Sequence, residues 1–132
     1  EDYAYLINAI NDLSEKTYNF KYRDLAIKLT KEAIDKFYLS DRNIFQKNPK
    51  NNKDVFFRPI DISDNTIPNG NAIMLINFIR LGMIEEAKKL SYSLNGYLNV
   101  YKSHMMTSLK AIDYFNNTTS GKNCNHEGCA ID

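Results

Sequence analysis

A polar loop that leads directly into an almost uniformly apolar helix is the feature that most constrains this chain. Segment 58–82 reads RPIDISDNTIPNGNAIMLINFIRLG. Apolar residues around the whole circumference predict a helix over 71–81 that is buried on nearly every side. Gly82 is a favourable residue to end it. Because the loop brings polar groups to the positive N-terminal end of a buried helix, the segment is typical of a binding site.

Helical periodicity predicts four more helices, over 2–15, 22–38 and 84–97 and from about Ser103 onward. The second and fourth helices in chain order carry charged residues opposite an apolar stripe, as expected of helices that face solvent. The first, third and fifth are more apolar. We therefore predict an all-α fold of antiparallel helical hairpins, with the odd helices inside and the even helices outside.

Two short runs at 43–46 and 54–58 alternate like strands, and a turn-rich segment separates them. They predict a small β-hairpin insertion.

If consecutive helices run antiparallel, the N-termini of the three inner helices emerge on one face. That face is the predicted site, with contributions from Glu1, Asp2, Tyr3, Arg58, Asp64, Asn69, Gly70, Asn71, Ser103 and His104.

Composition narrows the class of protein. The 132 residues are 43% hydrophobic and 25% charged, as in a single globular unit. The net charge of +1 is spread along the chain, so we expect neither nucleic-acid nor membrane-surface binding. No apolar run reaches the ~20 residues of a membrane span. We expect a cytoplasmic protein without a cofactor.

The chain divides into a predicted helical-hairpin domain, 1–117, and a polar tail, 118–132. The tail holds Cys124, His126 and Cys129, whose spacing matches no common zinc pattern, so we interpret it as a frayed terminus without a metal. Glu1 and Asp2 are typical of the start of a helix rather than of the start of a gene product. We therefore expect this chain to be a piece of a longer protein.

The charged candidates each have two interpretations. Asp2 and Asp64, with Glu1 nearby, are candidate catalytic carboxylates for acid and base work on a sugar. Alternatively, Asp2 stabilises a helix terminus and Asp64 a turn. Arg58 either binds a ligand carboxylate or phosphate, or holds the loop through Asp61 or Asp64. His104 is a candidate general base at the start of an inner helix.

The remaining candidates are ligand-binding residues. Asn71 donates to a ligand or caps the helix, and Asn69 lies beside it in the loop. Gly70 permits a close approach of the backbone or a positive φ. Tyr3 either belongs to an aromatic surface that stacks on a sugar ring, or packs in the hydrophobic core.

Three motifs, in order, resemble the YyaL-like proteins, a thioredoxin-domain family that includes the spermatogenesis-associated members. Glu1–Leu6 is similar to the family's E-D-Y-A-F-L, the run 64–72 to its D-G-x-x-P-S-G-N-S, and 101–103 to its Y-P-S. The resemblance covers roughly residues 1–115. Asn65, Asn69, Ala72 and Lys102 depart from the pattern, so chemistry that requires the family's two serine hydroxyls is not expected here.

The resemblance implies part of an (α/α)6 toroid, similar to N-acylglucosamine 2-epimerases and six-hairpin glycosidases, with a pocket that acts on or binds a carbohydrate-like ligand. The superfamily's epimerases use two histidines, and the predicted domain offers only His104. The alternative is a non-catalytic binding module beside a separate redox domain.

An incomplete toroid would leave apolar stripes uncovered on its first and last inner helices, here Leu6, Ile10 and Leu13, and Met105, Leu109 and Ile112. We expect the rest of a longer chain or a homodimer partner to cover them.

Overall fold

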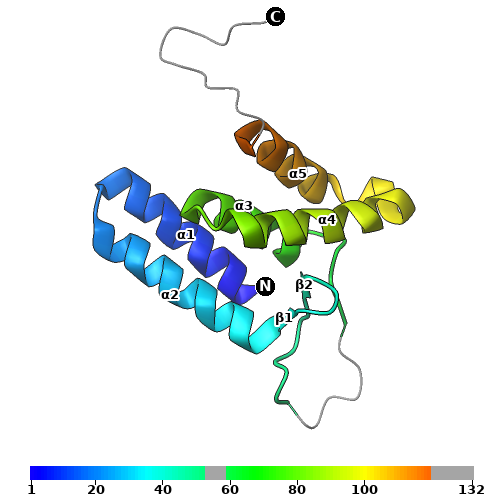
Figure 1. Cartoon of the computed structure of the whole chain (residues 1–132), viewed down its shortest axis with the longest axis horizontal. Coiled ribbons are helices and arrows are strands. Elements are labelled where there is room, and N and C mark those ends of the chain that lie inside the picture. The colour runs from blue at the N-terminus through cyan, green and yellow to red at the C-terminus, as the bar shows by residue number, and fades with distance from the viewer. Residues whose placement is uncertain (53–58, 120–132) are drawn as a thin grey trace, which may run out of the picture.

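The computed structural model describes residues 1–52 and 59–119 and is mostly helical within them (Figure 1). The elements in chain order are α1 (Asp2–Thr17), α2 (Phe20–Phe37), β1 (Tyr38–Leu39), β2 (Ile44–Phe45), α3 (Gly70–Leu81), α4 (Ile84–Tyr101), the short 3-10 helix η1 (Lys102–His104) and α5 (Met106–Thr119). α5 runs past the predicted domain boundary at 117, and the rest of the predicted tail lies outside the described residues. No helix in the described part is long and apolar enough to cross a bilayer.

The helices form an antiparallel array with α3 at its centre. α3 contacts α1, α4 and α5, whereas α2 packs mainly on α1. The direction of the chain alternates from helix to helix, so α1, α3 and α5 run the same way and start at one end of the molecule (Figure 1). Contacts confirm this arrangement, because Gly70 at the start of α3 lies against Glu1, and Asn69 bonds Ser108 in the first turn of α5.

The buried helix predicted from the sequence is confirmed as α3, of which only Ile76 and Arg80 are not fully buried. Its N-terminal cap is Asn69, whose Oδ1 accepts a hydrogen bond from the Ala72 N–H at 2.9 Å. The interpretation of Asn71 as the cap is therefore wrong by two residues. Gly82 ends the helix with a φ of 76°, as predicted.

In the part of the chain that the structure describes, the small sheet contains one pairing that the sequence analysis did not predict. β2 pairs with β1, in the register Tyr38 with Phe45 and Leu39 with Ile44, so the run at 43–46 finds its partner at the end of α2. The predicted partner, 54–58, lies outside the described residues. A short connection favours the β1–β2 pairing, because closing a short loop costs little chain entropy.

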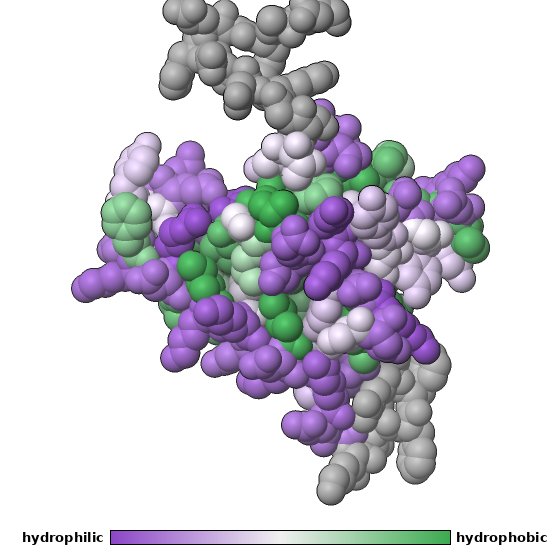
Figure 2. Space-filling model, in the orientation of Figure 1, coloured by the Kyte–Doolittle hydropathy of each residue, from purple (hydrophilic) through white to green (hydrophobic). Residues whose placement is uncertain are grey.

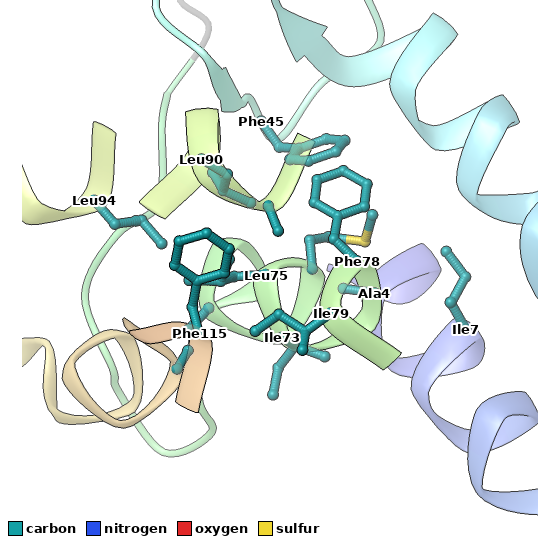
Figure 3. Packing of buried hydrophobic residues seen from close by; sticks show 14 of the residues in the cluster. Ala4, Ile7, Phe45, Ile73, Leu75, Phe78, Ile79, Leu90, Leu94 and Phe115 are labelled. Atoms are coloured by element: carbon teal, nitrogen blue, oxygen red, sulfur yellow. The ribbon is translucent and has the colours of Figure 1, made fainter. Parts of the chain in front are cut away.

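Aromatic contacts fix the sheet on the helices. The rings of Tyr38 and Phe45 meet edge to face with centroids 5.0 Å apart, and Phe45 approaches Phe78 of α3 at 5.9 Å. In Figure 3, Phe45 and Phe78 lie side by side, and Leu75 and Phe115 meet on the other side of α3. One core therefore joins β2 to α1, α3, α4 and α5.

The predicted uncovered stripes are only half confirmed. On α1, Leu6 is 51% and Leu13 is 42% exposed, whereas Ile10 is half-buried and packs against the core. On α5, Leu109 is exposed, but Met105 and Ile112 are buried, so the second stripe is wrong. The reason is that α5 uses that side to pack on α3 and α4. Figure 2 shows apolar atoms exposed among polar ones over α1 and its neighbours.

A buried polar network, which the sequence analysis overlooked, joins α1 to α3. The Asn77 side chain donates to the Ala4 carbonyl at 2.9 Å and accepts from the Asn11 amide at 3.2 Å. Arg80, at the other end of α3, donates to Asp12, Glu15 and Asn8. These bonds set the register of the two helices, because an apolar contact alone permits sliding along the axis.

Replacing Asn77 by alanine should lower the free energy of unfolding by about 1–3 kcal/mol, because the buried Asn11 amide and Ala4 carbonyl lose their partner. Urea denaturation followed by circular dichroism measures the change. Asn99→Ala, at an exposed position of α4, is the matched control. Equal stability of the two variants would show that the network does not stabilise the α1–α3 contact.

Candidate functional site

A cleft of about 200 Å³ opens where α1 and α3 begin, beside β2 and the end of α2. This volume is below the roughly 300–1,000 Å³ of drug-sized ligand pockets, so the cleft suits a small molecule. Its lining is Glu1, Asp2, Tyr3, Ala4, Ala33, Phe37, Phe45, Gln46, Lys47, Asp61, Gly70, Asn71 and Met74. Five of the ten predicted site residues are among them: Glu1, Asp2, Tyr3, Gly70 and Asn71.

One side of the cleft is charged. The Lys47 ammonium lies 2.8 Å from an Asp61 carboxylate oxygen and 3.8 Å from one of Glu1. Burial alone would raise the pKa of Asp61, but hydrogen bonds with the Lys47 and Glu1 side chains outweigh it and lower that pKa. The Asp61 and Glu1 carboxylates in turn raise the pKa of Lys47. Asp61 therefore stays ionised near neutral pH and presents hydrogen-bond acceptors at the edge of the cleft.

The opposite side is aromatic. The Tyr3 and Phe37 rings lie with centroids 5.6 Å apart. The Tyr3 hydroxyl donates to Glu32 at 3.1 Å and accepts from Lys36 at 2.8 Å, so its ring position is fixed. Tyr3 thus packs on Phe37 and also lines the cleft, and its stacking on a sugar stays a prediction.

The floor of the cleft is formed by the first turn of α3. Gly70 has an ordinary negative φ, so the expectation of a positive φ is wrong, while that of a close approach is confirmed. A Cβ at Gly70 would lie 3.2 Å from Glu1 Cγ and 3.3 Å from Glu1 Cα. A larger residue at this position would therefore require Glu1 to shift by a few tenths of an ångström, because the start of α1 packs against this backbone.

Asn71 lines the cleft but its amide group is already used. Its Nδ2 donates to the carbonyls of Phe45 and Asp61, and its Oδ1 accepts from the Phe45 N–H at 2.9 Å. The side chain thus binds both backbone groups of Phe45, as a neighbouring strand would. Asn71 positions β2 and the loop at Asp61, and neither of its predicted roles, capping or donating to a ligand, fits this geometry.

Asp64 lies outside the cleft lining and holds two helices together. Its carboxylate accepts from the Asn69 N–H and side-chain amide, both at 2.9 Å, and from the Thr107 N–H in the first turn of α5 at 2.7 Å. Burial would raise the pKa of Asp64, but these hydrogen bonds outweigh it and lower that pKa. The geometry matches the structural interpretation of Asp64, as a turn and cap residue.

Asn69 and His104 belong to this same junction. The Asn69 amide also donates to Ser108 at 3.2 Å, so both ends of that side chain are bonded. The His104 carbonyl accepts from the Asp64 N–H at 2.6 Å, and its exposed imidazole is not part of the cleft lining. Neither His104 nor Asp64 lines the cleft that Asp2 lines. Arg58 lies outside the described residues.

Three polar lining residues were not among the sequence candidates: Gln46, Lys47 and Asp61. The sequence analysis treats Asp61 only as a partner of Arg58, and Lys47 only as part of a turn-rich segment. Their contribution depends on the β1–β2 pairing, which brings 46–47 next to the loop at 59–61 through the Lys47 N–H to Pro59 carbonyl bond. The strand-like run at 43–46 was the available signal. In the described part of the chain, no group of His, Cys, Asp and Glu is placed to hold a metal ion.

Comparisons of this chain with protein-family models, with curated proteins and with solved structures find no match.

The lowered pKa values of Asp61 and Asp64 predict acid-sensitive stability. A carboxyl whose folded-state pKa is depressed stabilises the fold above its unfolded pKa, near 3.9, and this contribution is lost as the pH falls through the folded value. Unfolding free energies measured from pH 7 down to pH 2 should therefore fall below about pH 4. The fall should be shallower in Asp64→Asn than in Asp24→Asn, an exposed control on α2; identical profiles would contradict this.

Gly70→Val should lower stability or displace Glu1 from the cleft, because the added Cβ meets the Glu1 backbone. Thermal unfolding and amide chemical shifts at the start of α1 report the two effects. Gly96→Val is the control, since a Cβ there has nothing within 4 Å. If both variants have the same melting temperature and the α1 shifts do not move, the close approach is unimportant.

Proposed function

We propose that the cleft at the start of α1 and α3 binds a small carbohydrate-like molecule, and that the chain serves as a binding module. The observation that carries this proposal is the lining itself, with carboxylates and a lysine on one side and a fixed aromatic pair on the other. Hydroxyl groups of a sugar donate to carboxylates and accept from ammonium groups, while the apolar face of a sugar ring packs on aromatic side chains.

Binding is favoured over catalysis by the roles of the candidate catalytic residues. Asp64 is committed to the starts of α3 and α5, and His104 is not in the lining. The two carboxyls that come closest to each other in the lining, Glu1 and Asp61, both contact the Lys47 ammonium, at 3.8 and 2.8 Å. A glycosidase keeps one carboxyl protonated as the general acid, whereas the pKa of Asp61 is lowered by its pairing with Lys47 despite its burial.

We further propose that the chain is the C-terminal part of a YyaL-like protein, in which α1, α3 and α5 contribute one side of an (α/α)6 toroid and its pocket. The motifs at 1–6, 64–72 and 101–103 support this assignment. The alternating direction of the five helices and the shared end of the odd helices support it too. In that setting a thioredoxin-like domain elsewhere in the protein would carry any redox chemistry.

Titration of the isotope-labelled chain with glucose, mannose and N-acetylglucosamine, followed by amide chemical shifts, tests the binding proposal. We expect perturbations confined to the amides of Gln46, Lys47, Gly70 and Asn71. Asp61→Asn should weaken the affinity by about 10- to 100-fold, since a hydrogen bond to a charged group contributes roughly 1.5–3 kcal/mol.

Asp113→Asn on α5, remote from the cleft lining, is the matched control and should bind as the wild type does. The same samples, followed over time, reveal epimerised or hydrolysed sugar if the cleft is catalytic. Shifts scattered over the surface, or none with any of the three sugars, would refute the proposal.

A further inference from the structure

One side of α1 is left free by the helices packed around it. Asn8, Asn11, Asp12 and Glu15 point to α3, through Asn77 and Arg80. Tyr3 points to α2, through Glu32 and Lys36. The residues that remain on the third side are Asp2, Leu6, Ala9, Leu13 and Lys16, and all five are exposed. We refer to these five residues as the α1 seam.

The spacing of the α1 seam is that of a coiled coil. Its members follow one another at intervals of four, three, four and three residues, which keeps them in one line along a helix. Leu6 and Leu13 are the apolar positions, 51% and 42% exposed. Ala9 stands between them, and a small residue at the centre of such a line lets two helix backbones approach closely. A helix of similar length is therefore the shape that fits.

The charges of the seam select a second copy of this chain in the antiparallel direction. Asp2 is at one end and Lys16 at the other, and neither is paired within the described residues. A two-fold axis beside Ala9 places Leu6 of each copy on Leu13 of the other, and Asp2 of each copy beside Lys16 of the other. A parallel pair would instead set like charges against each other at both ends.

We propose that α1 mediates a symmetric, antiparallel dimer through Asp2, Leu6, Ala9, Leu13 and Lys16. A single helix pair falls at the small end of specific interfaces, below roughly 1,200 Å². The dimer is therefore reversible and dependent on concentration. Asp2 also lines the cleft, so the interface adjoins the proposed binding site, although the dimer does not depend on what the cleft binds.

Sedimentation velocity of the 132-residue chain over a range of concentrations tests the dimer. We expect association in the wild type and its loss in Leu13→Asp. Leu109→Asp is the matched control, because Leu109 is a leucine of similar exposure, 49%, on α5. Circular dichroism checks that both variants stay helical, and both substitutions are at exposed positions, where folding should survive.

Charge reversal distinguishes the proposed geometry from any other contact through the leucines. Asp2→Lys and Lys16→Asp should each weaken association about tenfold, since each change turns two attractive contacts into repulsive ones. The double variant should recover most of the loss, because the pairs are restored with their signs exchanged. Failure of the double variant to recover, with helix content unchanged, would overturn the antiparallel pairing.

A cross-link provides the last check. In a background with Cys124→Ser and Cys129→Ser, Ala9→Cys should form a disulfide-linked dimer under mild oxidation, whereas Asn95→Cys on α4 should not. A wild-type chain that stays monomeric at every accessible concentration would overturn the proposal. So would dissociation by Leu109→Asp but not by Leu13→Asp.

Discussion

The rest of the structure depends on how the first turn of α3 is held. Asp64 and Asn69 form one hydrogen-bonded unit that caps α3, bonds the first turn of α5 and leaves no side-chain donor unused. The first N–H groups of a helix need partners when they are buried. Here those partners belong to a loop that also reaches a second helix, so two helices begin at the same place.

This junction places the cleft but does not line it. With α3 and α5 fixed at their starts, Gly70 accepts the close approach of Glu1, and Asn71 fastens β2 against the loop at Asp61. Asp64, Asn69 and Asn71 therefore hold the fold together, whereas Asp61, Lys47 and the start of α1 supply charged groups to the lining of the cleft. Asp64 and Asn69 thus support the cleft without lining it.

A different part of α1 determines how the molecule meets others. The side of α1 toward α3 carries a buried amide pair and an arginine with three partners, which fix the helix in position. Its free side carries two leucines, an alanine and complementary charges. Because the polar side chains that face α3 already have partners within the fold, the free side of α1 can contact a second copy without disturbing the core. We infer that α1 contributes separately to the cleft and to the dimer.

The sequence by itself determined the helices, because periodicity, an apolar circumference and Gly82 are local signals. Short connections also made α1 and α2, and α3 and α4, antiparallel, whereas the long segment 38–69 left the direction of α3 to tertiary packing. Tertiary structure alone decided which strand β2 pairs with, that Asn69 rather than Asn71 caps α3, and that Met105 and Ile112 are buried. The physical reason is competition for partners, since a polar side chain or an apolar face can satisfy several neighbours. Only packing in three dimensions decided that Asp64 and Asn71 bind backbone groups within the fold, whereas Asp61 pairs with Lys47 at the edge of the cleft.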